Sequence, residues 1–226
     1  MTNQASKDIN RTAGMVLVTG AVLAIAFMLH HPSTGGDSFA AALAELRDEA
    51  SLSGWVHGAL IVVMSGIWFG GYGLSLDLGI KQPLPALGFL AFTLGTLAYA
   101  MAAMFSGFIT PHIGDVFAES TPEQMEHARA LLSLTGAANQ AFANAGLIGT
   151  AVGILAWSLA LVSSAGLGRW VGIFGVLVSA LPAVLLLTGH LVLHITGMTL
   201  VVVAHGAWYA LGGVLLLRGG VQKTSR

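Results

Sequence analysis

Six long apolar segments follow one another along the chain, and they constrain its fold more than any other feature. Each holds about 20 or more mostly apolar residues, the length that an α-helix needs to cross the hydrocarbon core of a bilayer. None alternates between polar and apolar residues, as the strands of a membrane β-barrel do. The sequence therefore predicts an all-α integral membrane bundle of six transmembrane helices, at about residues 12–31, 54–78, 84–110, 137–163, 170–192 and 197–217.

The composition agrees with a bundle that is covered by lipid. Of the 226 residues, 55% are hydrophobic and 8% are charged, whereas a soluble domain usually carries about 25% charged residues. No polar linker divides the apolar segments, so residues 1–226 are predicted to form a single domain. The formal net charge is −1 and cysteine is absent. We therefore expect no nucleic-acid partner, no disulfide and no thiolate metal site.

Proline and glycine mark the predicted helix ends. Pro111 is expected to end the third span. Pro182 lies inside the fifth span and is expected to kink it, which membrane helices tolerate when neighbouring groups pair with the freed carbonyl. Either Thr188-Gly189 or Thr196-Gly197 is predicted to form the turn before the sixth span.

Positively charged residues gather at one end of the predicted bundle, and most of the acidic residues lie at the other. The positive end carries Lys7, Arg11, Lys81, Arg169, Arg218, Lys223 and Arg226, whereas the opposite end carries only Arg47 and Arg129. Positively charged loops stay in the cytoplasm. Both termini are therefore predicted to be cytoplasmic.

Two loops on the predicted outer side are long enough to fold into helices. In the first, Asp37 is a plausible cap for a helix whose apolar residues form a stripe that predicts a position on the membrane surface. The stripe consists of Phe39, Leu43, Leu46 and Ala50. In the second, Thr121-Pro122-Glu123-Gln124 has the pattern of a capping box with a first-turn proline. It predicts a second short interfacial helix over about residues 122–134.

All eight histidines lie at or toward the predicted outer side. His57, His190 and His205 fall within spans, where ionisable side chains are costly and a functional role is the default interpretation. Imidazole is the commonest metal-ligating side chain, and several histidines without cysteine suit a transition metal such as Zn, Cu or Fe. The sequence therefore predicts a metal site for redox or hydrolytic chemistry. The candidate ligands are His31, His57, His112, His190, His194 and His205.

Other interpretations of the histidines stay open. In the simplest, each ring hydrogen-bonds a neighbouring helix or lies among lipid headgroups. A proton relay or pH sensor is another. A haem- or quinone-linked electron carrier is a further one, because a b-type haem needs two histidines from different helices at one depth. His57 and His205 are the pair that matches by depth.

The sequence leaves the kind of protein open as well. It contains no nucleophile elbow, no phosphate-binding loop and no dinucleotide-binding motif, so it does not decide whether the chain is an enzyme. A non-enzymatic subunit or regulatory partner of a larger membrane complex fits equally. Small residues four positions apart let helices approach closely, and we expect them to pack within the chain rather than in a homo-oligomer. They are Gly66 and Gly70, Gly149 and Gly153, and Gly168 and Gly172.

Four short motifs carry a resemblance to a known group. Arg11-Thr12-Ala13-Gly14 opens the first span and His31-Pro32 closes it, Trp55-Val56-His57 opens the second, and Arg169-Trp170-Val171-Gly172 opens the fifth. In this arrangement the chain resembles small bacterial six-helix inner-membrane proteins of a domain-of-unknown-function type. The resemblance covers most of the chain and implies a location in the bacterial inner membrane. It implies no activity and no catalytic residue.

Overall fold

The computed structural model describes residues 2–30 and 38–220, and all regular structure within them is helical. The elements, in chain order, are α1 (Thr2–Leu29), α2 (Phe39–Asp48), α3 (Ala50–Leu78), α4 (Pro83–Met104), the π-helix η1 (Phe105–Ile109), α5 (Thr110–Phe117), α6 (Pro122–Val162), α7 (Leu167–Leu187) and α8 (Ile195–Leu217).

Six helices of the described chain are long and apolar enough to cross a membrane, which confirms the predicted number. They cover Lys7–Leu29, Ala50–Leu78, Pro83–Phe117, Pro122–Val162, Leu167–Leu187 and Ile195–Leu217. Each overlaps one predicted span. The long apolar runs are thus sufficient to locate the helices, because each run is longer than the about 10–14 apolar residues that are typical of a helix buried in the core of a soluble protein.

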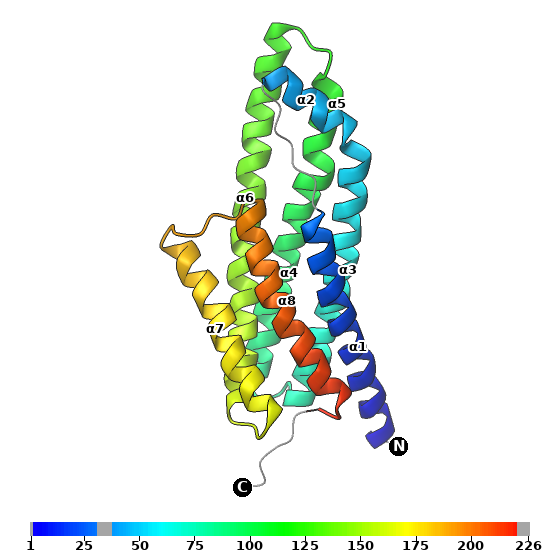
Figure 1. Ribbon diagram of the computed structural model, residues 1–226, viewed down its shortest axis with the longest axis vertical. Helices are drawn as coiled ribbons and strands as arrows, with labels where there is room; N and C mark the ends of the chain where they lie inside the picture. The colour runs from blue at the N-terminus through cyan, green and yellow to red at the C-terminus, as the bar shows by residue number, and fades with distance from the viewer. Residues whose placement is uncertain (1, 31–37, 221–226) are drawn as a thin grey trace.

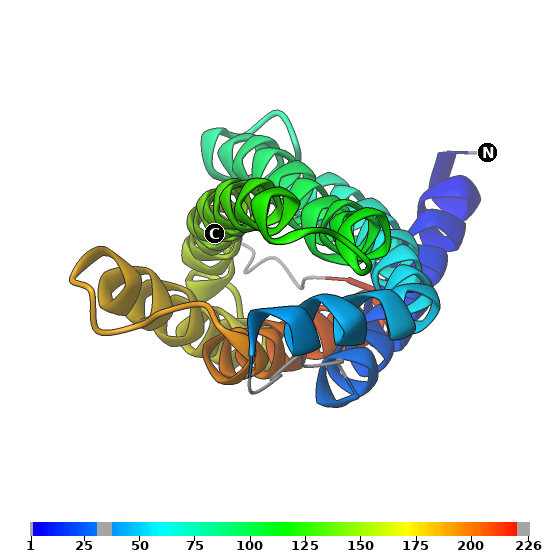
Figure 2. The same ribbon diagram turned by 90° about the horizontal axis from the view of Figure 1, so that it is seen from above.

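The helices form a ring in which each packs against its two neighbours in the order α1, α3, α4, α6, α7, α8 and back to α1. Figure 2 shows this ring from above, with α2 lying over it. The start of α1 and the end of α8 lie at the same end of the molecule (Figure 1). The loops that join α3 to α4 and α6 to α7 lie there too.

The third span does not end at the proline, as the sequence had predicted. It continues through η1 and α5 to Phe117. The N–H of Thr110 bonds to the carbonyl of Phe105, five residues earlier. The helical turn just before Pro111 therefore contains one residue more than an α-helical turn. Pro111 then stands in the first turn of α5, where a missing N–H is tolerated. The proline shifts the helix register and does not stop the helix.

The second predicted interfacial helix is not a separate element. Residues 122–134 belong to α6, which runs without a break from Pro122 to Val162. The capping box is present: Thr121 N donates to Gln124 Oε1 at 2.9 Å, and Gln124 N donates to Thr121 Oγ1 at 3.4 Å. Gly136 is the expected weak point, but one glycine costs a helix only about 1 kcal/mol relative to alanine. The start was therefore predicted correctly and the end was wrong.

The first predicted short helix is present as α2, and its apolar stripe packs on protein. Ser38 is the N-cap, and its Oγ accepts a hydrogen bond from Ala41 N at 3.2 Å; Asp37 lies outside the described residues. Leu43 is fully buried. A Cβ added at Gly114 of α5 would come within 3.1 Å of the Leu43 carbonyl oxygen. Leu43 and Leu46 of the stripe therefore pack on α5.

The turn between the last two spans lies at the first of the two predicted places. α7 ends at Leu187, five residues before the predicted end, and Gly189 follows with a φ of 76°. A left-handed glycine after the last turn is a common way to end a helix. His190 N then bonds back to the Leu185 carbonyl at 2.8 Å. Thr196-Gly197 lies inside α8.

The glycine pairs pack helices within the chain, as expected. A Cβ at Gly149 of α6 would lie 2.7 Å from the backbone nitrogen of Gly95 in α4. A Cβ at Gly172 of α7 would lie 2.7 Å from the backbone nitrogen of Val162 in α6. Such distances mean that the helix backbones touch directly. The ring is held together at these points by small residues and close van der Waals contact.

Candidate functional site

A cavity of about 390 Å³ lies between α1, α3, α4, α6 and α8. Its wall is mostly apolar, and none of the described residues that line it is Asp, Glu, Lys or Arg. Two of its lining residues, Thr150 and Asn139, stand about 18 and 35 Å along α6 from Val162, at 1.5 Å per residue. Clefts of this size and composition are typical of small-molecule sites.

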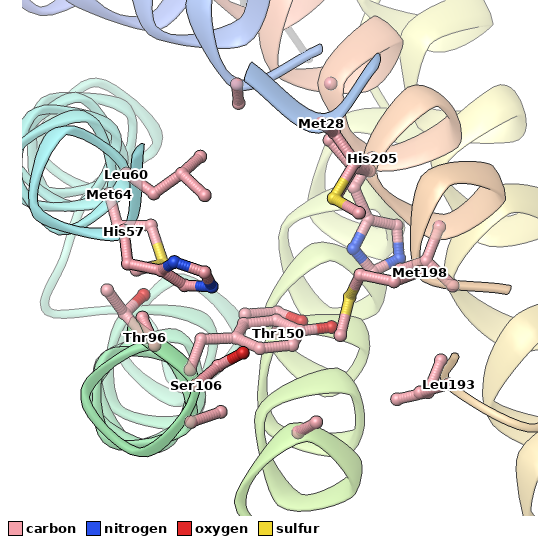
Figure 3. Close-up of a pocket in the computed structure, with 18 of the residues that line it drawn as sticks. Met28, His57, Leu60, Met64, Thr96, Ser106, Thr150, Leu193, Met198 and His205 are labelled. Atoms are coloured by element: carbon pink, nitrogen blue, oxygen red, sulfur yellow. The ribbon is translucent and has the colours of Figure 1, made fainter. Parts of the chain in front are cut away.

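His57 projects into the cavity from α3 (Figure 3). Its side chain is 3% exposed, and its Nδ1 lies 2.8 Å from the backbone carbonyl oxygen of Ser53, one turn earlier. A carbonyl oxygen only accepts, so Nδ1 carries the hydrogen. Gly107 of η1 packs directly against the His57 side chain. The π-turn therefore brings backbone against the ring, and π-turns are frequent at functional sites.

His205 projects into the same cavity from α8, across from His57 (Figure 3). Its side chain is also 3% exposed, and its Nε2 is buried without a hydrogen-bond partner. The ring interacts with the backbone of Val178 in α7. Residue 182 would normally donate to the Val178 carbonyl, but Pro182 has no N–H. His205 thus faces a carbonyl that the proline leaves without its helical partner.

Tyr99 of α4 and Thr150 of α6 add two hydroxyl groups to the wall. The Thr150 hydroxyl donates to the Gly146 carbonyl at 2.8 Å. The Tyr99 hydroxyl lies beside Thr150. It is buried and has no hydrogen-bond partner. Most buried polar atoms in proteins are paired. The cavity therefore holds two polar atoms, on Tyr99 and His205, that a bound molecule can satisfy.

Stacked aromatic rings lie beneath the cavity. Phe92 and Tyr209 line it, with ring centroids 5.7 Å apart. Phe92 packs on Trp157 at 5.0 Å, and Trp157 stacks on Trp208 at 5.9 Å with the planes 4° apart. Trp157 Nε1 donates to Ser75 Oγ at 2.8 Å. These packed rings lie between the cavity and the end of the bundle that carries the start of α1 and the end of α8.

The segment between α7 and α8 closes the cavity where α6 faces α8. Leu193 is buried and packs with Ala143 and Leu147 of α6. His194 follows it, lines the cavity and is exposed. Gln140 also lies at this level of α6, with its Nε2 donating to Asn144 Oδ1 at 2.9 Å. His194 and Gln140 thus add polar groups to this side of the cavity.

The six histidines predicted as metal ligands do not come together. His57, His194 and His205 line the cavity, His112 lies in a second hollow with Asp115, and His190 is exposed with Nδ1 3.0 Å from the Thr188 hydroxyl. His31 lies outside the described residues. Within the described ranges no three His, Asp or Glu side chains are close enough to hold one metal ion. The metal site therefore stays a prediction without structural support.

The sequence interpretation missed several residues of the wall. They are Met64, Thr96, Tyr99, Ser106, Thr150 and Met198. Thr96 and Tyr99 are three residues apart and so share one helix face, which was the available signal. Met64 and Met198 gave none, because methionine is ordinary in an apolar span. By contrast, the pairing of His57 with His205 by depth predicted two residues that do share the cavity.

Comparison with known proteins found no relative: no family model, curated protein or solved structure matches the chain.

Proposed function

We propose that the chain is a multi-pass protein of the bacterial inner membrane that binds a neutral, mostly apolar small molecule in this cavity. The observation that carries the proposal is the wall itself, which is apolar and holds a buried His205 Nε2 without a hydrogen-bond partner. A buried polar atom left unpaired costs about 1–3 kcal/mol, and a ligand that pairs with it recovers that cost. The proposal assigns binding, and it assigns no catalytic step.

The charge of the wall favours a neutral occupant. A charged group that leaves water for an apolar site loses several kcal/mol unless an opposite charge meets it. None of the described lining residues is Asp, Glu, Lys or Arg. An apolar molecule with one or two hydrogen-bonding groups matches this wall better than an ion does.

The depth of the cavity favours a ligand that arrives from the bilayer. The hydrocarbon core is about 30 Å thick, and the lining positions on α6 begin about 18 Å from its C-terminal residue, at 1.5 Å per residue. With Lys81 and Arg169 at the cytoplasmic surface, the cavity occupies the outer half of the membrane. Apolar molecules concentrate in this region because burial from water favours them.

A cavity-filling substitution tests the proposal. We expect Ala143→Phe, on the cavity wall of α6, to weaken saturable binding of the neutral probe N-phenyl-1-naphthylamine at least about tenfold, because the added ring occupies the site. A lost 1.4 kcal/mol corresponds to tenfold. Binding is measured by energy transfer from the buried Trp157 and Trp208 to the probe, with the protein in lipid nanodiscs.

Ala141→Phe is the matched control, because Ala141 is exposed on the same helix. It should bind the probe like the unchanged chain. If the unchanged chain shows no saturable transfer, or if both variants bind equally well, the cavity is not a ligand site and the proposal is wrong.

The orientation is tested with single cysteines, because the chain has none of its own. Glu123 and Lys81 are both exposed, at opposite ends of the bundle (Figure 1). We expect Glu123→Cys to react with a membrane-impermeant maleimide in intact spheroplasts, and Lys81→Cys to react only after the membrane is opened. The positive charge near Lys81 keeps that end in the cytoplasm. The reverse pattern of labelling would refute cytoplasmic termini.

A b-type haem held by His57 and His205 is a second candidate. It is favoured by the hydrogen bond from His57 Nδ1 to a backbone carbonyl, because metal-ligating histidines usually donate their other N–H in this way. Its two propionates, however, would meet no Lys or Arg among the described lining residues. A Soret band in the purified protein that disappears in His57→Ala and His205→Ala supports haem, and a colourless sample rejects it. Elemental analysis of the same samples tests a metal ion.

A further inference from the structure

We propose that the ligand is a lipid alcohol, an apolar chain whose one hydroxyl group binds between His205 and Tyr99 at the inner end of the cavity. This inference rests on the proposed function, because it names the chemical class of the molecule in the same cavity. It follows from the length of the cavity and from two buried polar atoms of its wall that have no hydrogen-bond partner among the described residues. They are His205 Nε2 and the Tyr99 hydroxyl oxygen.

The cavity is long in the direction of the helices. Its lining residues on α4 and η1 extend from Phe92 to Ser106. Those on α8 extend from Ile195 to Tyr209. Each range is about 21 Å long at 1.5 Å per residue, and the helices run along the longest axis of the molecule (Figure 1). A site of this length fits a chain better than a compact molecule.

The inner end of the cavity is closed by a contact between two aromatic rings. Phe92 of α4 and Tyr209 of α8 both line the cavity, and their ring centroids are 5.7 Å apart. These two helices are not neighbours in the ring of helices, so the contact crosses its interior. The two aromatic rings form the floor of the cavity, and a bound chain ends in the layer of side chains just above them.

Tyr99 and His205 reach this layer from opposite sides. Tyr99 stands about 10 Å beyond Phe92 along α4, and His205 stands about 6 Å from Tyr209 along α8, at 1.5 Å per residue. Side chains lean toward the N-terminus of their helix. α4 and α8 begin at opposite ends of the bundle (Figure 1), so the Tyr99 side chain leans toward the floor and the His205 side chain leans away from it. The two unpaired atoms therefore lie at a similar depth.

A hydroxyl group can pair with both atoms, whichever nitrogen of His205 carries the hydrogen. Nε2 of a neutral imidazole either donates or accepts, whereas the Tyr99 hydroxyl does both. A ligand hydroxyl can donate to Nε2 or accept from it, and in either case it can still pair with Tyr99. An ether oxygen only accepts, and an alkyl chain does neither. A charged headgroup would meet no Asp, Glu, Lys or Arg among the described lining residues, which makes its burial costly.

The wall farther from the floor suits the chain of such an alcohol. It is formed by aliphatic side chains, among them Leu60, Ala103, Ala143, Leu193, Val201 and Val202. Met28, Met64 and Met198 also project into the cavity (Figure 3). Methionine is flexible and adapts to irregular shapes. These three side chains can therefore move to accommodate a chain and to give its hydroxyl access to the buried polar atoms.

The test compares compounds of similar length that differ in their polar group. They are 1-dodecanol, farnesol, 1-methoxydodecane and tridecane, each measured by displacement of N-phenyl-1-naphthylamine in nanodiscs, with concentrations expressed per lipid so that partitioning does not contribute. We expect 1-dodecanol to bind at least about tenfold more tightly than tridecane, because the alkane leaves both polar atoms unpaired. It should also bind more tightly than the ether. The order of 1-dodecanol and farnesol distinguishes a straight-chain from an isoprenoid alcohol.

Two variants connect the preference for the hydroxyl to the residues. Tyr99→Phe removes only a hydroxyl group, and His205→Phe removes the ring nitrogens. Each should reduce the preference for 1-dodecanol over tridecane at least about threefold, because one polar partner of the ligand is lost. Tyr72→Phe is the matched control, since Tyr72 is exposed on α3 and does not line the cavity. It should leave the preference unchanged.

Tyr99→Phe also has a readout without ligand. The hydroxyl that it removes is buried and has no hydrogen-bond partner among the described residues, so its loss should leave the unfolding midpoint of the ligand-free protein unchanged or raise it. If His205→Phe fails to fold, Tyr99→Phe decides the assignment by itself.

The outcomes separate this inference from the proposed function. If the probe binds and tridecane or the ether competes as well as the alcohols, the hydroxyl assignment is wrong while the cavity remains a ligand site. The same conclusion follows if none of the four compounds displaces the probe, if Tyr99→Phe keeps the full preference, or if it lowers the unfolding midpoint. If the probe itself does not bind, both proposals fall.

Discussion

Gly95→Ala is expected to destabilise the bundle by about 1–3 kcal/mol, a typical cost of forcing extra atoms into a packed interior. A Cβ at Gly95 of α4 would stand 2.7 Å from the carbonyl carbon of Gly149 and 2.9 Å from the carbonyl oxygen of Gly146, both in α6. These are backbone atoms, so no side-chain rotation relieves the contact. The two helices have to separate, which also opens the wall of the cavity near Thr150.

The matched control is Gly136→Ala in α6, which is expected to change stability in the opposite direction. Nothing lies within 4 Å of a Cβ at Gly136, and alanine is favoured over glycine inside a helix by about 0.5–1 kcal/mol. Unfolding of the purified variants in detergent, followed by circular dichroism, compares the two. Equal midpoints for Gly95→Ala and the unchanged chain would show that α4 and α6 are not in backbone contact.

His205→Leu is expected to destabilise the protein by about 1–3 kcal/mol, because the His205 ring lies against the Val178 carbonyl and leucine has no group that can donate to it. The substitution should cost less in the background of Pro182→Ala. The alanine introduced by that change has an N–H that can donate to Val178 within α7, as residues four apart do in a regular helix. The two residues should therefore show an interaction free energy of about 1 kcal/mol in a double-mutant cycle.

A second cycle controls for the general effect of removing a proline. Pro83 is exposed in the first turn of α4, far along the chain from His205. Pro83→Ala and His205→Leu should have additive effects on the free energy of unfolding, because they share no partner. If the cycle with Pro182 is additive as well, His205 does not support the carbonyl that the proline leaves free. The buried position of His205 would then be explained only by its contact with a bound ligand.

The two proline outcomes show why helix ends were harder to predict than helices. Pro111 was expected to end a span, yet a π-turn absorbs it and the helix continues to Phe117. Pro182 was expected to kink α7 and to need help from a neighbour, and His205 lies beside the affected carbonyl. A proline removes one donor in both cases. Whether the helix continues depends on how the chain compensates for the lost donor, which is a change of helical register at Pro111 and a side chain from another helix at Pro182.

Only part of the candidate site was predicted from the sequence, because the rest also depends on contacts between helices. His57 and His205 were paired because helix rise converts residue number into depth, and both do line one cavity. Depth alone says nothing about direction around a helix, so His112 and His190 were equal candidates, and they lie elsewhere. Tyr99 and Thr150 were missed because their role depends on the contact of α4 with α6.

The amino-acid sequence by itself determined that six apolar helices form and that the chain carries its charge at two ends. Both follow from local composition, because apolar length and charge are properties of each segment alone. Only the tertiary structure decided that α6 is one unbroken helix, that α2 packs on α5, and that two histidines from α3 and α8 face one uncharged cavity. These depend on free-energy differences of about 1 kcal/mol and on contacts between segments far apart in the chain.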